Sequence, residues 1–203
     1  MEIVPLVLAA GLPAAGLVVF FLLVHSSFRQ AVEGSDDPGI RARLFPKLAI
    51  FVMQSFTSVV FGFVVWSISS IWEVDIDRAA HACLTIGATG LCTVIAQSLL
   101  ARGAMKGIAR DERSFGKEMI SMAQAEPTVI FGFVVSFLMM MPPTTGTGYR
   151  TGALVMALLS LGAPAAAPFV ARIPVAEFPR RIIFGTAMMA GPLFGFLLAF
   201  LLI

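Results

Sequence analysis

The segment Met119–Met141 is an apolar run that contains one charged side chain, the carboxylate of Glu126. As an α-helix this run spans about 34 Å, which exceeds the bilayer hydrocarbon core of about 30 Å and places Glu126 near the middle depth. A carboxylate at that depth costs about 2.5–3.5 kcal/mol on insertion scales, so such residues usually bind or pass on an ion. Its neighbours at three and four residues along the helix are apolar. We therefore expect a partner from another helix, or a protonated carboxyl group.

The chain as a whole has the composition of an integral membrane protein. Hydrophobic residues make up 58% of its 203 residues and charged residues 13%, against roughly 25% charged in soluble domains. The net charge of +2 is too small to indicate nucleic-acid binding. Cys83 and Cys92 lie in one apolar run, and we expect buried thiols there, with neither a disulfide framework nor a metal site.

Six apolar runs are long enough to cross a bilayer, and polar loops separate them. The first run has no basic segment before it and is longer than the apolar part of a secretory signal, so we expect a retained helix. The runs are Ile3–Val24, Leu48–Trp72, Ala79–Ala101, Met119–Met141, Thr151–Ala171 and Ile182–Ile203. They predict an all-α membrane protein built from three tandem helical hairpins, at residues 1–72, 73–141 and 142–203, the last opening with Pro142-Pro143 and a Thr/Gly turn.

Basic residues are concentrated on one side of the predicted membrane span. The loops after the first, third and fifth runs hold 12 of the 14 Lys and Arg residues, and the other side has only Arg78 and Arg150. By the positive-inside rule, the three hairpin loops are cytoplasmic and both termini lie on the opposite side. We therefore expect a multi-pass protein of the cell (inner) membrane.

The three hairpins are copies of one another. A Phe-Pro-Lys, Phe-Gly-Lys or Phe-Pro-Arg triplet opens each even-numbered run, and a Phe-Gly-Phe triplet begins 16 residues after the Phe of each opening triplet. Three copies that share a spacing without a gap indicate an internal repeat. At the position of Glu126 the first copy has Phe56 and the third has Met189, so only the middle hairpin keeps a carboxylate. The Phe-Gly-Phe triplets lie at residues 61–63, 131–133 and 194–196.

The middle hairpin resembles the proteolipid rotor subunit of rotary ATPases, the c or K subunit of V/A-type enzymes. The resemblance is close over roughly residues 86–141 and weaker in the outer hairpins, where mainly the second helix matches. It rests on GATGLCTVIAQ in the first helix, GAMKGIARDERSFGK in the loop and AEPTVIFGFVVSFL in the second helix. The family includes members with duplicated or triplicated hairpins. The resemblance implies a two-layered ring of subunits that rotates past a static membrane subunit, with a carboxylate on an outer helix carrying H+ or Na+.

The resemblance also implies roles for individual residues. Glu126 matches the ion-carrying carboxylate, and Gln97 matches a glutamine that hydrogen-bonds it or ligates sodium. Thr57 matches a threonine that helps to bind sodium, whereas Ser58 stands where sodium-type members have a glutamine, and Phe61 where many members have a tyrosine. Because these two departures remove oxygen ligands, we favour H+ over Na+. The alternative is a sodium site at Glu126, Gln97 and Thr57.

The partners that the resemblance implies are further copies of the chain in the ring, the static membrane subunit, a central stalk subunit at the cytoplasmic loops, and lipid. No nucleic acid and no cofactor are expected. The subunit would perform no covalent chemistry itself, and would serve an ATP-hydrolysing or ATP-synthesising complex as its ion carrier.

Two other classes of function remain open. A six-helix proton-coupled secondary transporter is expected to have two related halves with broken helices around a midplane site, not three equal hairpins. A structural proteolipid or assembly factor would use Glu126 and Gln97 only to hold helices together. For Thr57 and Ser58, packing between membrane helices is the ordinary role of such residues.

Overall fold

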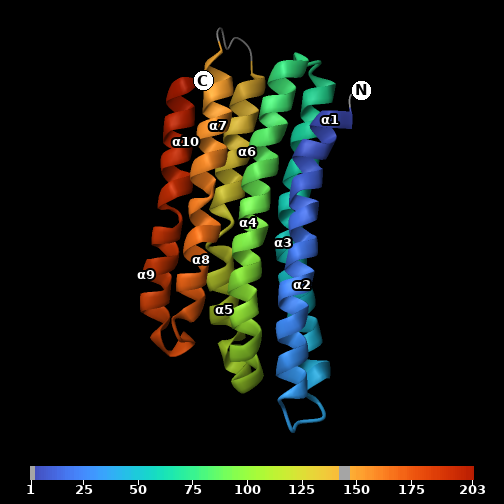
Figure 1. Cartoon of the computed structure of the whole chain (residues 1–203), viewed down its shortest axis with the longest axis vertical. Helices are drawn as coiled ribbons and strands as arrows, with labels where there is room; N and C mark the ends of the chain where they lie inside the picture. The colour runs from blue at the N-terminus through green and yellow to red at the C-terminus, as the bar shows by residue number, and fades with distance from the viewer. Residues whose placement is uncertain (1–2, 142–146) are drawn as a thin grey trace.

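The computed structural model describes residues 3–141 and 147–203, and these residues form helices without any strand. Six helical spans are long and apolar enough to cross a membrane, which confirms the expected six-helix membrane fold (Figure 1). The first hairpin comprises α1 (Ile3–Leu6), a π-helical turn (Val7–Gly11), α2 (Leu12–Glu33) and α3 (Ile40–Ile71). The second hairpin comprises α4 (Ile76–Arg110), a 3-10 turn (Glu112–Ser114), α5 (Phe115–Ala123) and α6 (Pro127–Met140). The third hairpin comprises α7 (Gly148–Ser160), α8 (Gly162–Arg172), a 3-10 turn (Val175–Glu177), α9 (Phe178–Met188) and α10 (Ala190–Leu202).

The helices extend beyond the apolar runs. α3 begins eight residues before its run, at Ile40, and α4 continues from the end of its run to Arg110. Hydropathy marks the part of a helix that lipid can cover, whereas the helix itself continues for as long as its backbone groups are paired. The expected boundary between the second and third hairpins, with Pro142-Pro143, lies outside the described residues.

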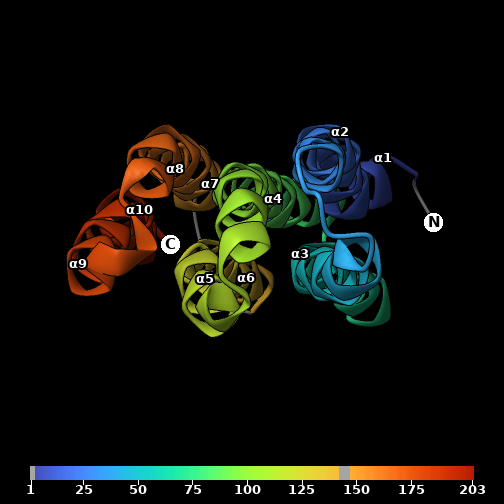
Figure 2. The same cartoon turned by 90° about the horizontal axis from the view of Figure 1, so that it is seen from below.

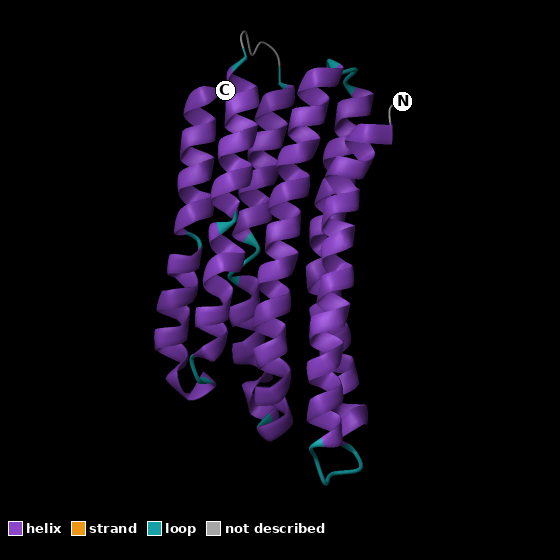
Figure 3. Ribbon diagram, viewed as in Figure 1, coloured by secondary structure: helices purple, strands orange, loops and turns teal. Residues whose placement is uncertain are grey.

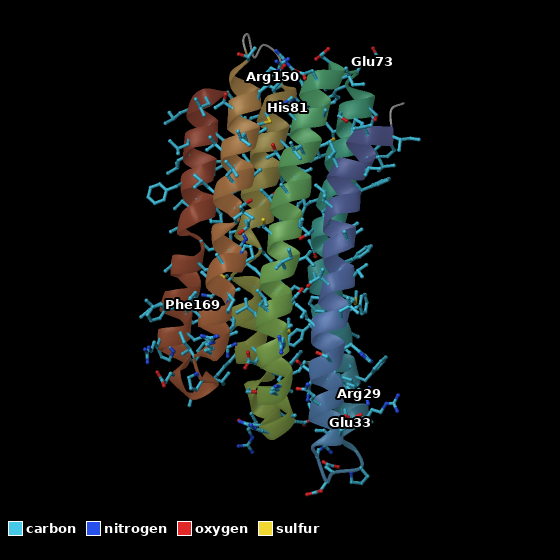
Figure 4. The ribbon with its side chains drawn as sticks, viewed as in Figure 1. Arg29, Glu33, Glu73, His81, Arg150 and Phe169 are labelled. Carbon is cyan, nitrogen blue, oxygen red and sulfur yellow. The ribbon has the colours of Figure 1, made fainter. Side chains whose placement is uncertain are left out.

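Charged side chains gather at the two ends of the bundle (Figure 4). At the end that holds the hairpin turns, Arg29 pairs with Glu33 on α2 at 2.6 Å, and Lys47 of α3 pairs with Glu112 of the second hairpin at 2.9 Å. At the opposite end, where both termini lie, Arg150 pairs with Asp77 at 2.8 Å. The apolar lengths of the helices lie between these two polar ends, as a bilayer requires.

The spans are arranged in two rows (Figure 2). One row contains α1–α2, α4 and α7–α8, and the other contains α3, α5–α6 and α9–α10. α4 is central in its row, with α2 on one side and α7 and α8 on the other, and it is the most buried of the spans. The hairpins follow one another in chain order, so the first and the third each leave one edge of this two-layered slab open.

The glycine of each Phe-Gly-Phe triplet has the same role in its own hairpin. A Cβ on Gly62 would overlap the carbonyl oxygen of Ala9, and a Cβ on Gly132 would overlap the Thr89 side chain. A Cβ on Gly195 would lie 3.0 Å from the Cβ of Leu159. The glycine therefore lets each even-numbered span approach the odd-numbered span beside it, which is the use that small residues have in membrane helix packing.

We predict that Gly62→Ala destabilises the protein by about 1–3 kcal/mol, the usual penalty of overpacking, because the added methyl group meets a backbone oxygen that cannot rotate away. The measurement is the apparent melting temperature of the purified protein in detergent. Gly116→Ala is the matched control, since no atom lies within 4 Å of its added Cβ. Equal melting temperatures for the two variants would contradict the close approach of α3 to the first span.

Candidate ion-binding site

Glu126 lies at an interruption of the fourth span, where α5 ends at Ala123 and α6 begins at Pro127 (Figure 3). Pro127 has no N–H to donate to the carbonyl of Ala123, which instead accepts from Glu126 N at 3.0 Å. The turn is tightened to bonds three residues apart, and Glu126 keeps right-handed helical angles. The break therefore leaves the direction of the span intact and sets a half-buried carboxyl group midway along it.

The hydrogen-bond partner of Glu126 comes from the first hairpin. Gln54 Nε2 on α3 donates to Glu126 Oε1 at 2.8 Å, and no ion pair to Glu126 occurs among the described residues. The bond crosses the junction between two neighbouring spans of one row. A hydrogen bond of this kind can hold a carboxyl group in place while leaving its second oxygen able to take or lose a proton.

Gln97, the partner expected from the sequence, is fully buried in α4, but neither polar atom of its amide has a hydrogen-bond partner in the described structure. Thr93, one turn earlier on α4, donates to the carbonyl of Ala125 at 3.5 Å, so Gln97 lies about one helical turn from the level of the break. Buried amides without partners are rare. Two further buried oxygens without partners, Gln54 Oε1 and Ser55 Oγ, belong to the α3 segment that faces the break.

The other two predicted site residues lie on α3 in different surroundings. Thr57 is exposed on the outside of the helix, whereas Ser58 is buried, with its Cβ 3.5 Å from the position of a Cβ on Gly90 of α4. The described hydrogen bonds therefore join Glu126 to Gln54 and not to Gln97, Thr57 or Ser58. For these three residues an ion-binding role stays a prediction.

At the junction between the second and third hairpins, the residues at the same register positions make different contacts. Gln124 occupies the register position of Gln54, and Met189 that of Glu126. Gln124 Nε2 donates to the carbonyl of Ile182 at 3.0 Å, and Thr128 Oγ1 lies 3.8 Å from Met189 Sδ. The helix is again interrupted at Met189, because Pro192 has no N–H for the carbonyl of Met188.

A second carboxylate in the same span, Glu118, is neutralised by an arginine. Arg181 of α9 approaches it with two nitrogens, Nη2 to Oε2 at 2.7 Å and Nη1 to Oε1 at 3.0 Å, and both side chains are only 2% exposed. A buried pair of this kind is strongly destabilised when one partner is removed. Glu118 is therefore tied to Arg181, whereas Glu126 has no ion-pair partner among the described residues.

Sequence reasoning gave Gln54 no role in the ion site and did not find the Glu118–Arg181 pair, although the repeat contains a signal for both. Gln54 and Gln124 share one register position in two copies, which is unusual in otherwise apolar runs, and Glu118 and Arg181 share another. Opposite charges at one level of adjacent helices can meet. Both signals required knowing that successive copies lie side by side, which the spacing alone does not establish.

Comparison with known proteins identifies the same hairpin. Residues 81–139 match the ATP synthase C-subunit family, which is 59 of the 203 residues. No curated protein and no solved structure matches the chain. The matched segment contains Gln97, Glu118 and Glu126, and ends before the third hairpin. The second hairpin is therefore similar to the ion-carrying proteolipid of ATP synthases.

Proposed function

We propose that the chain is a rotor-ring subunit of a V/A-type rotary ATPase, in which Glu126 carries H+ across the membrane as the ring turns. The observation that carries the proposal is the position of Glu126: it is half-buried midway along a membrane span, bound to the amide of Gln54 and free of any ion pair among the described residues. The similarity of residues 81–139 to the ATP synthase C-subunit family supports it.

In this proposal the carboxyl group alternates between two states. While Glu126 faces lipid it is protonated, because an ionised carboxylate in hydrocarbon is too costly, and Gln54 holds it in a fixed orientation. Beside the static membrane subunit, water and a cationic group would favour loss of the proton. Rotation of the ring then connects proton uptake on one side of the membrane with release on the other.

We favour H+ over Na+ because Gln54 already satisfies one oxygen of the carboxyl group and a proton satisfies the other. Sodium stripped of water needs several oxygen ligands. Among the buried oxygens without hydrogen-bond partners, Gln54 Oε1, Ser55 Oγ and Gln97 Oε1 are the ones that a sodium ion at Glu126 would have to gather. Thr57 is exposed on α3 and has no hydrogen bond to any of these groups among the described residues.

The first prediction concerns the carrier. A hydrophobic carbodiimide should modify Glu126 alone among the 12 acidic residues, because the reaction needs a protonated carboxyl group within reach of lipid. Glu118, shielded by Arg181, should not react. Peptide mass spectrometry after labelling in native membranes identifies the site.

Glu126→Gln should in addition abolish coupled ion transport in reconstituted vesicles while leaving the complex assembled. Glu177→Gln, at an exposed residue paired with Arg180, is the control and should transport normally. Transport that survives in Glu126→Gln would contradict the assignment of the carrier.

The second prediction concerns the ion. If H+ is carried, labelling of Glu126 should fall steadily as pH rises and should be the same in Na+ and in K+ at one ionic strength. The measurement is the labelling rate across a pH series in both salts. Specific protection by millimolar Na+ would overturn the choice of H+ and make Gln54, Ser55 and Gln97 the ligands to test.

The third prediction concerns stoichiometry. One carboxylate for every six helices delivers fewer ions per turn than a ring of equal circumference built from single hairpins, and each charge moved against 100 mV costs about 2.3 kcal/mol. The ATPase should therefore sustain a steep gradient and suit pumping better than synthesis. The measurement is the number of ions moved per ATP in sealed vesicles, together with the number of protomers in the ring. A ratio well above one ion per protomer per turn would mean that another group carries ions.

The first and third hairpins, which have no carboxylate at the register of Glu126, should respond differently when a carboxylate is introduced there. Met189→Glu places a carboxyl group beside Thr128, and the adjacent second hairpin carries Gln124 at the register of Gln54. We therefore expect a stable ring that moves more ions per ATP. Phe56→Glu has no glutamine at the corresponding register, where the third hairpin has Ala187, and should assemble poorly. An unchanged ratio in Met189→Glu would show that Met189 and Glu126 are not equivalent in the ring.

A further inference from the structure

The two junctions inside the chain are built by the same aromatic contact. Phe61, the first Phe of the first triplet, packs against Phe133, the last Phe of the second triplet, with ring centroids 5.2 Å apart. Phe131, the first Phe of the second triplet, packs against Phe196, the last Phe of the third, also at 5.2 Å. The first Phe of one copy thus meets the last Phe of the next copy at each junction.

This rule leaves one phenylalanine of each outer triplet without its counterpart. Phe63, the last Phe of the first triplet, is 53% exposed and has a ring contact with Trp66 of its own helix. Phe194, the first Phe of the third triplet, is 61% exposed and has no ring contact among the described residues. The four phenylalanines within the junctions are all partly buried. By equivalence with Phe133 and Phe131, which face the neighbouring hairpins, we infer that Phe63 and Phe194 face the two open edges of the slab.

We propose that a second copy of this chain covers each edge, with Phe194 of one copy packed against Phe63 of the next in the same register as the internal junctions. This inference rests on the proposed ring and specifies how neighbouring protomers meet. Each contact joins two different surfaces, the third hairpin and the first, so it is heterologous. A heterologous contact gives a ring when its repeated rotation closes and an open filament when it does not, and the proposed rotor requires closure.

The other row of helices points to the same neighbour. α4 is buried on both sides because α2 flanks it on one side and α7–α8 on the other. α2 and α8 each have such a neighbour on one side only, and large apolar side chains such as Leu22 and Phe169 stay exposed on them (Figure 4). A copy that brings its α2 beside α8 would give both helices the surroundings that α4 has within one chain.

The junction between copies differs from the internal junctions in its chemistry. Inside the chain, Gln54 meets Glu126 and Glu118 meets Arg181. At the same register positions the junction between copies has Ala187 opposite Phe56, and Leu48 opposite an arginine that is already paired. The junction between copies therefore lacks the two buried polar pairs that join neighbouring hairpins within one chain.

Cross-linking in native membranes tests the register. Phe63→Cys and Phe194→Cys, combined in one chain, should react with a short bifunctional thiol reagent to give a ladder of dimers, trimers and larger species up to the closed ring on a denaturing gel. Each single variant should remain monomeric, and the two single variants expressed together should stop at dimers. The unmodified chain is the background control, since Cys83 and Cys92 are buried.

The internal junction calibrates the reagent. Phe61→Cys combined with Phe133→Cys should cross-link within one chain, which shows that the protein is folded and that the reagent spans this contact. A reactive internal pair with no ladder from Phe63→Cys and Phe194→Cys would overturn the proposed contact. Dimers from either single variant would also overturn it, since they indicate a two-fold contact between like edges.

Carbodiimide labelling and transport of the double variant before cross-linking separate this inference from the proposed function. Normal labelling and transport without a ladder would refute the register and leave the ion carrier standing. Absence of both transport and any oligomer by native mass would refute the rotor itself.

Discussion

A carboxyl group midway along an apolar span needs a polar partner from another helix, and here Gln54 supplies it across the junction of two hairpins. The neighbouring residues of Glu126 on its own helix cannot offset a charge at that depth. The first hairpin, which has no carboxylate of its own, is therefore part of the site. The buried Glu118–Arg181 pair likewise joins one hairpin to the next.

These contacts depend on how closely the helices approach. Gly62, Gly132 and Gly195 each remove a side chain where an even-numbered span faces the odd-numbered span of its own hairpin. The two rows can then pack with their helices in register, and the Phe residues on either side of each glycine are left to contact the adjacent hairpin. One triplet thus determines both the packing within a hairpin and the contact with the next hairpin.

The prolines explain why the site lies at an interruption. Pro127 and Pro192 break the fourth and sixth spans near the same register position, whereas α3, with Thr57 at the position of Pro127, runs through it unbroken. A missing N–H tightens the turn without ending the span. The interruption is therefore shared by a hairpin with a carboxylate and one without, so it belongs to the architecture of the bundle and not to the carboxylate.

The number of spans follows from the sequence, because apolar run length is a local property of the chain. The prediction that Glu126 carries an ion likewise starts from a local property, a lone midspan carboxylate. Helix ends were less predictable, because helices such as α4 continue past the apolar run into polar segments. Only the tertiary structure decided that Gln54 and not Gln97 donates to Glu126, and that Arg181 neutralises Glu118. Those partners depend on which hairpins are neighbours and on how each helix is rotated about its axis. Both are set by the packing of the whole bundle, which no single run of residues contains.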